Sequence, residues 1–127
     1  DENTTRFLFW ATGGFAGLLR AAFRVIETVA DEIRADPQSD AAAGKVAKRR
    51  PVLEECRTIW TSLTPSEQHV LKAAGQLIKF EHTPENERAI PMLVQKKLLT
   101  VDHVTNALVI QPPVLRAFVS ANPESAA

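Results

Sequence analysis

A change of sequence pattern near residue 98 constrains the fold of this chain more than any other feature. Two helix-start signals precede it. Residues 64–67 (Thr-Pro-Ser-Glu) can form a capping box with proline at the first helical position, and residues 83–85 (Thr-Pro-Glu) repeat the order of cap, proline and acid. Residues 98–111 then carry β-branched side chains on both sides of a turn-forming stretch at 102–106, which predicts two strands in a hairpin. Two prolines end this stretch, and a short helix over 114–119 is expected after them.

Apolar stripes predict the remaining helices of this second half. A stripe that begins with a proline predicts a helix over 51–63. The helix that begins at residue 64 is expected to continue through Gly75 to about Phe80, because its stripe carries on past the glycine. Pro91 lies inside the next run, and it either kinks a helix over 84–99 or divides it in two.

Helical pieces that end in a two-stranded hairpin are the arrangement of a winged helix. The fold class is therefore expected to be mainly α. We expect a winged-helix domain over 51–127, with 51–63 as its leading connector helix and the hairpin as its wing. The polar tail over 122–127 is expected to fray.

The first half of the chain, residues 1–50, predicts a small separate helical unit. Residues 6–34 form two helices around the Gly13-Gly14 pair, since paired glycines interrupt a helix. The second helix has an apolar face at spacings of three and four, made of Leu19, Ala22, Phe23, Ile26, Ala30 and Ile33. Residues 35–50 have almost no large apolar side chains and predict a mobile linker. Its basic residues can meet phosphate or stay solvated: Lys45, Lys48, Arg49 and Arg50.

The composition excludes several classes of protein. Lys and Arg number 15 and Asp and Glu number 15, so the chain lacks the basic excess of a general nucleic-acid binder. Its single cysteine, Cys56, excludes an internal disulfide framework and suits a reducing cytoplasm.

No apolar run approaches the roughly 20 residues of a membrane span, and no signal peptide begins the sequence, so we expect a cytoplasmic chain without membrane contact. The first residue is not Met, so we also expect a piece of a longer polypeptide.

The stretch Thr12–Arg20 (TGGFAGLLR) resembles the lid-helix motif of AAA+-like signal-transduction ATPases of the STAND class. In that class a Gly-Gly pair, a variable residue and a proline begin a lid helix that continues Leu-Leu-Arg. The stretch from Leu63 to Leu115 is similar to the winged helix that follows such lids. Two positions depart from the pattern: Ala16 stands in place of the proline that often lies against adenine, and Lys97 stands in place of a helix-ending glycine. We therefore expect that helix to end differently.

The resemblance implies a nucleotide-binding core, with ATP or ADP and Mg²⁺, on the N-terminal side of residue 1. Its implied nucleotide-proximal residues here are Gly13, Gly14, Ala16 and Arg20; Arg20 either reaches a γ-phosphate or faces solvent. The chain itself has no phosphate-binding loop, so we expect no enzyme activity and no cofactor of its own. The implied function is a regulatory module that packs on the nucleotide core and contacts protein partners. Its helical unit over 6–34 is a candidate for self-association.

The alternative function is DNA binding, because winged helices commonly place a helix in the major groove. The candidate residues are Arg88, Gln95, Lys96 and Lys97 on the helix, and His103 and Asn106 on the wing. The charge balance disfavours this alternative: residues 51–127 hold seven basic and eight acidic side chains, and residues 1–50 hold eight and seven. Glu85 and Glu87 would also approach the phosphates.

Other chemistry has no clear support in the sequence. The spacings of His69, His82 and His103 match no metal-binding motif, so no metal site is expected. No serine stands in a nucleophile elbow, and no catalytic residue is proposed. Cys56 lies on the apolar stripe of its helix and is expected to be a buried hydrophobic residue rather than a reactive thiol.

Overall fold

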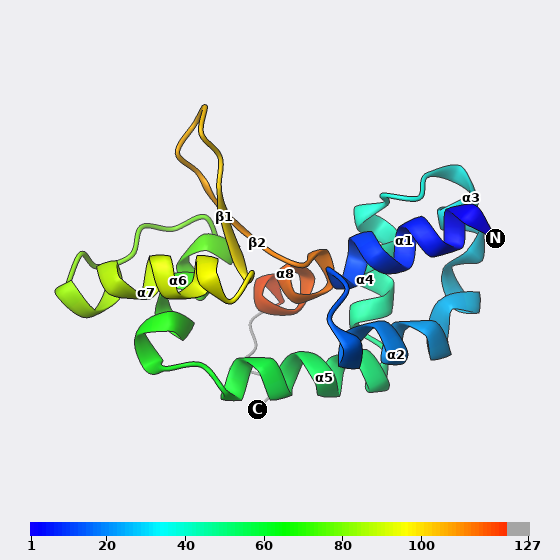
Figure 1. The fold of residues 1–127 in the computed structure, drawn as a ribbon, viewed down its shortest axis with the longest axis horizontal. Coiled ribbons are helices and arrows are strands. Elements are labelled where there is room, and N and C mark those ends of the chain that lie inside the picture. Colours follow the sequence, from blue (N-terminus) through cyan, green and yellow to red (C-terminus); the bar gives the residue numbers. More distant parts are fainter. Residues whose placement is uncertain (122–127) are drawn as a thin grey trace.

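The computed structural model describes residues 1–121 and is mainly helical, with a small two-stranded antiparallel sheet (Figure 1). The tail expected over 122–127 lies outside the described residues. Within the described part, no helix is both long and apolar enough to span a lipid bilayer. The elements in chain order are α1 (Glu2–Thr12), α2 (Ala16–Val25), a 3₁₀ turn η1 (Ile26–Val29), α3 (Ala30–Ala35), α4 (Asp40–Ala47), α5 (Arg50–Thr61), α6 (Pro65–Gly75), α7 (Pro84–Gln95), β1 (Leu99–Val101), β2 (Leu108–Ile110) and α8 (Pro113–Ser120).

Helix α8 lies at the centre of Figure 1, with α1 to α4 on one side, α6 and α7 on the other, and α5 running below it. It packs against α1, α4, α5, α6 and β2. Its buried face comprises Val114, Leu115, Phe118 and Val119, which belong to a single hydrophobic core that also contains Phe7 from α1. The core therefore crosses residue 50, where the sequence predicted a domain boundary.

The predicted mobile linker over 35–50 is wrong, because half of it, Asp40–Ala47, forms α4. The Ser39 hydroxyl caps this helix by accepting a hydrogen bond from the Ala42 N–H at 3.1 Å. Ala42 and Val46 are fully buried, and α4 packs directly against α8. Residues 35–50 have almost no large apolar side chains, but small side chains let two helices approach closely. Within the basic cluster, Lys45 forms an ion pair with Glu32 and Arg50 pairs with Glu54.

The Gly13-Gly14 break is confirmed, because both glycines adopt left-handed φ angles of 63° and 77°. The apolar face predicted after it is partly wrong. The helix changes to the 3₁₀ turn η1 at Ile26, which rotates the following residues relative to a continuous α-helix. Phe23, which lies in α2 before this change, is 65% exposed and so does not belong to the buried face. The buried residues of α2, η1 and α3 are Leu18, Ala21, Ala22, Val29 and Ile33.

Helix α6 ends at Gly75, so its predicted continuation to Phe80 is also wrong. Leu77 adopts a left-handed φ of 56°, and the Ile78 N–H donates back to the Ala73 carbonyl at 3.0 Å, a helix-ending pattern usually built with glycine. Gly75 lies directly against α8 and β2: a Cβ there would be 3.0 Å from Val119 Cγ1. Leu77 and Ile78 remain largely exposed to solvent.

Helix α7 runs through Pro91 without dividing, and it ends at Gln95. The expectation that Lys97 changes the helix end is wrong. Lys97 itself adopts the left-handed conformation, with φ 65°, and the Leu98 N–H donates to the Leu93 carbonyl at 3.0 Å. Lysine thus occupies the position that favours glycine, at some backbone strain.

The predicted hairpin is confirmed. β1 and β2 pair antiparallel, with Leu99 opposite Ile110 and Val101 opposite Leu108. The Asp102 carboxylate holds the connecting turn by accepting a hydrogen bond from the Val104 N–H at 2.8 Å. In Figure 1 the hairpin projects away from the helices.

Candidate functional site

The Gly-Gly turn between α1 and α2 is fixed by a buried threonine. The Thr12 hydroxyl donates to the Leu8 carbonyl at 2.6 Å and accepts from the Gly14 N–H at 3.3 Å. The turn lies against the segment that links β2 to α8, because a Cβ added at Gly13 would be 3.2 Å from Pro112 Cβ. Elements that are separated by about a hundred residues therefore meet at this turn.

A cavity of about 520 Å³, which we name the hairpin cleft, lies between this turn, the end of α7 and the hairpin. It is lined by Gly13, Phe15, Val94, Lys97, Leu99, Thr100, Val101, His103, Gln111 and Pro112. The volume lies within the range of small-ligand and peptide side-chain pockets. The cleft contains residues from both sets of predicted site residues. Gly13 belongs to the predicted nucleotide-proximal set, whereas Lys97 and His103 belong to the predicted DNA-binding set.

Two basic side chains without acidic partners line the cleft. Lys97 and His103 are exposed, and neither has an ion pair or side-chain hydrogen bond within residues 1–121. No Asp or Glu lines the cleft. The nearby Asp102 carboxylate is held in the hairpin turn, where the backbone N–H groups of Val104 and Thr105 lower its pKa. The cleft thus combines apolar walls with a net positive edge.

The other nucleotide-proximal candidates lie elsewhere. Arg20 is exposed in a separate groove of about 250 Å³ between α2 and α5, beside Arg24, Arg50 and Glu54. Gly14 and Ala16 are exposed and do not line the hairpin cleft. The structure therefore does not gather this set into one pocket.

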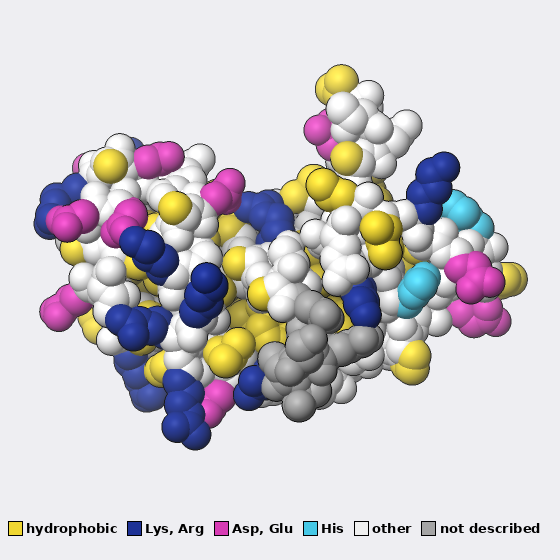
Figure 2. Space-filling view, turned by 180° about the vertical axis from the view of Figure 1, so that it is seen from behind, with side chains coloured by type: hydrophobic (Ala, Val, Ile, Leu, Met, Phe, Trp, Pro, Cys, Tyr) yellow, Lys and Arg dark blue, Asp and Glu magenta, His cyan; other side chains and the backbone are white. Residues whose placement is uncertain are grey.

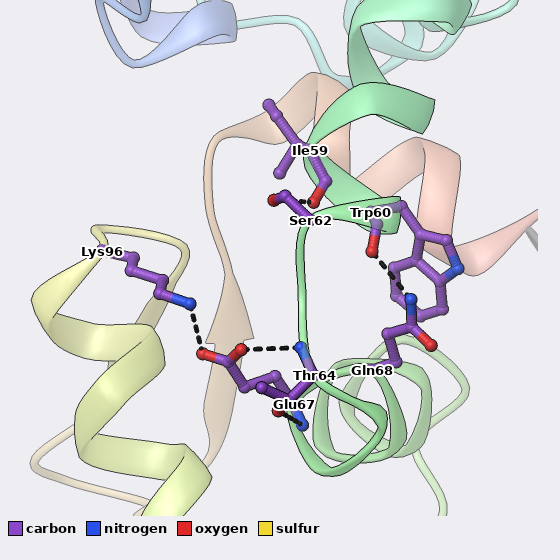
Figure 3. Close-up of polar contacts among 7 residues, drawn as sticks. All are labelled: Ile59, Trp60, Ser62, Thr64, Glu67, Gln68 and Lys96. Atoms are coloured by element: carbon purple, nitrogen blue, oxygen red, sulfur yellow. Dashed lines mark hydrogen bonds and ion pairs between the residues drawn. The ribbon is translucent and has the colours of Figure 1, made fainter.

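Among the DNA candidates, Lys96 is engaged within the protein. Its Nζ lies 2.7 Å from Oε2 of Glu67, a carboxylate that is 3% exposed. Figure 3 shows this ion pair together with the capping box, in which Glu67 Oε1 accepts from the Thr64 N–H at 2.9 Å. Burial alone would raise the pKa of Glu67, but the bonds from Lys96 and Thr64 hold it below its ordinary value.

The remaining DNA candidates are dispersed. Arg88 Nη2 lies 3.9 Å from Oε1 of Glu85, and both side chains are largely exposed. Gln95 is exposed near the end of α7. Asn106 has a left-handed φ of 60°, and its N–H donates to the Asp102 carbonyl at 2.7 Å, so it closes the hairpin turn.

The hairpin itself contributes no cations of the kind that bind a phosphate backbone. Residues 98–111 contain no Lys or Arg. Figure 2 shows that, on this face, the basic side chains are scattered among acidic ones and lie mostly over the N-terminal helices, away from the projecting hairpin. A duplex-binding surface would need its cations gathered where the phosphates run.

The other chemically interesting residues have structural roles. Cys56 is fully buried, its Sγ lies 3.9 Å from the Val114 carbonyl oxygen, and burial, with a smaller effect of Glu55, raises its pKa to about 12. The His69 ring accepts a hydrogen bond from the Glu81 N–H at 3.3 Å, and His82 contacts Glu87. No group of three or more His, Cys, Asp or Glu side chains within residues 1–121 is placed to hold a metal ion.

Sequence reasoning missed the apolar walls of the cleft. Phe15 and Val94 were not predicted as site residues, and Pro112 was expected only to end a strand. The available signal was the Gly-Gly pair, which indicates a close approach of backbone to another element but does not identify that element. The protein-family models, curated proteins and solved structures that were compared with this chain include no match. The site is therefore assigned from its geometry.

Proposed function

We propose that this chain is a non-catalytic regulatory module of a nucleotide-dependent signalling ATPase, made of a lid-like helical unit and a winged helix. In this proposal α6, α7 and α8 are the helices of the winged helix and the hairpin is its wing. The module packs on a nucleotide-binding core in the same polypeptide and contacts a protein partner. It responds to ATP or ADP through its affinity for that core rather than by chemistry of its own.

The contact between the Gly-Gly turn and the hairpin base carries this proposal. Gly13 lies against Pro112, and α1 and α4 pack on α8, so the lid-like unit and the winged helix share one core. A change imposed on the lid-like unit would therefore move the winged helix with it. Such coupling is what a regulatory module needs in order to relay a conformational change.

An exposed aromatic residue beside the turn supports a docking role for this end of the module. Phe9 is 56% exposed, and its Cδ1 lies 3.8 Å from where a Gly14 Cβ would be. A large exposed apolar side chain next to this turn is a candidate contact for the core.

The test measures binding of this chain to the nucleotide-binding segment of its own polypeptide, loaded with ADP or with a non-hydrolysable ATP analogue. We expect a complex whose affinity differs between the two nucleotides, because only differential affinity can transmit the nucleotide state. Phe9→Ser should weaken the complex without unfolding the chain, whereas the exposed Phe23→Ser serves as a matched control on α2. Absence of a complex, or absence of a phosphate-binding loop from the polypeptide, would overturn the proposal.

DNA binding is the second candidate, and the charge distribution weighs against it. A salt titration of fluorescence anisotropy with a labelled duplex separates the two functions. We expect no submicromolar binding even at low salt, because Lys96 is paired with Glu67 and the hairpin has no Lys or Arg. Tight binding that weakens steeply with salt would favour the DNA function.

A further inference from the structure

The outer edge of β1 has unused backbone groups. Antiparallel strands alternate between residues whose N–H and C=O groups bond to the partner strand and residues whose groups point away. Leu98 accepts from the Gln111 N–H at 2.9 Å and the Asp102 N–H donates to Ala107 at 2.9 Å. The alternation therefore directs the N–H and C=O of Val101 away from β2, and no other described residue bonds to them.

This edge borders the hairpin cleft. Val101 lines the cleft and is partly exposed, whereas Leu99 is buried at its base. Phe15, Val94 and Pro112 supply apolar surface beside it. A backbone that pairs with Val101 would thus place one of its side chains against apolar walls, which is how extended peptides gain both affinity and specificity at a sheet edge.

The charges at the cleft restrict the chemistry of such a peptide. Lys97 is the charged side chain in the cleft lining, no carboxylate faces it there, and Asp102 is already held by the turn. The backbone of Lys97 adopts a left-handed conformation, which lysine disfavours. Charge complementarity therefore selects an acidic occupant.

We propose that the hairpin cleft binds an extended acidic peptide segment of a protein partner. The segment pairs through its backbone with the free edge of β1 at Val101, inserts an apolar side chain between Phe15 and Pro112, and places a carboxylate beside Lys97. This inference rests on the proposed function, because it names the class of partner that the regulatory module contacts.

The test uses fluorescence anisotropy of a labelled peptide, Glu-Leu-Thr-Val-Glu, against the whole chain. We expect saturable binding that weakens with salt. The peptide Lys-Leu-Thr-Val-Lys should bind at least about tenfold more weakly, because its charges oppose Lys97. Equal binding of the two peptides, or no binding of either, would overturn the inference.

Two proline variants provide a matched pair for the edge itself. Val101→Pro removes the outward N–H of β1, and Leu108→Pro removes the equivalent outward N–H of β2 on the opposite edge. Neither N–H belongs to the β1–β2 ladder, so circular dichroism should show both variants folded. Val101→Pro should weaken peptide binding about fivefold and Leu108→Pro should leave it unchanged. Equal effects of the two substitutions would contradict strand pairing at β1.

Lys97→Gly tests the charge without endangering the fold, since glycine prefers the left-handed conformation. We expect the Lys97→Gly variant to bind the acidic peptide about threefold more weakly than the parent chain does. The variant should be no less stable than the parent chain. Undiminished binding would contradict the role of Lys97. Failure of all peptide binding would leave the nucleotide-dependent complex with the core intact, so failure of this inference and failure of the proposed function are distinguishable.

Discussion

At the scale of single residues, Glu67 joins two helices and the segment that precedes them. Its carboxylate closes the capping box at the start of α6 and pairs with Lys96 just after α7 (Figure 3). Glu67 is 3% exposed, so its charge is stabilised by these bonds rather than by water. Removing the charge would leave the Lys96 ammonium without its partner.

We expect Glu67→Gln to lower the free energy of unfolding by about 1–2 kcal/mol at pH 7. The pKa of Glu67 in the folded protein lies below its ordinary value of 4.5, so its charge contributes stability above that value, and this contribution is lost as the pH falls through the folded pKa. In urea unfolding, the difference in the free energy of unfolding between Glu67→Gln and the parent chain should therefore be smaller at pH 3 than at pH 7. Glu85→Gln is the control, because Glu85 is largely exposed and should contribute little. A difference that grows toward low pH would contradict this account.

Leu77 and Lys97 store backbone strain at the ends of α6 and α7, with φ of 56° and 65°. Leu77 is 92% exposed, so replacing it removes almost no buried surface. Leu77→Gly and Lys97→Gly should each raise the free energy of unfolding by about 1 kcal/mol, because glycine adopts this conformation without steric penalty. Denaturant unfolding measures the change. Lys97→Ala keeps the strain and should show little gain; a gain equal to that of glycine would rule out strain as the cause.

At the scale of helices, two glycines with opposite surroundings allow a paired prediction. Gly44 lies in α4 with nothing within 4 Å of an added Cβ, whereas a Cβ at Gly75 in α6 would lie 3.0 Å from Val119 Cγ1 and 3.2 Å from Ile110 Cδ1. Gly44→Ala should stabilise the chain by about 0.5–1 kcal/mol through helix propensity. Gly75→Ala should destabilise it by about 1–3 kcal/mol through overpacking. Thermal unfolding of both variants measures whether each substitution stabilises or destabilises the chain. A stabilising effect of Gly75→Ala would contradict the close packing of α8 against α6.

At the scale of the whole molecule, α8 makes the two halves of the chain depend on one another. Trp10 lies in α1, and Trp60 in α5 contacts Phe118 with ring centroids 6.5 Å apart. Trp60→Phe leaves Trp10 as the fluorescence reporter, and Trp10→Phe leaves Trp60. We expect the two reporters to give the same urea midpoint, because one core serves both halves. Leu115 is a fully buried residue of α8. In each single-tryptophan variant, Leu115→Ala should lower the urea midpoint, which corresponds to a loss of about 2–5 kcal/mol in the free energy of unfolding. Separate midpoints would indicate two independent domains.

Local signals in the sequence determined where several elements begin and turn. The caps at Thr64 and Thr83, the Gly13-Gly14 break and the hairpin turn at 102–106 are in the structure where they were predicted. Each depends on hydrogen bonds or backbone conformations within about four residues of chain, so the residues themselves contain the necessary information.

Only the tertiary structure decided which of these elements pack together. The sequence by itself could not show that the small residues of α4 would be buried against α8, that α6 would end at Gly75, or that Gly13 would lie beside Pro112 and complete the hairpin cleft. Burial and close approach depend on surfaces that come from distant parts of the chain, and no local pattern encodes the partner. The sequence therefore determined the mainly helical class and the hairpin, whereas long-range packing created the shared core and the candidate site.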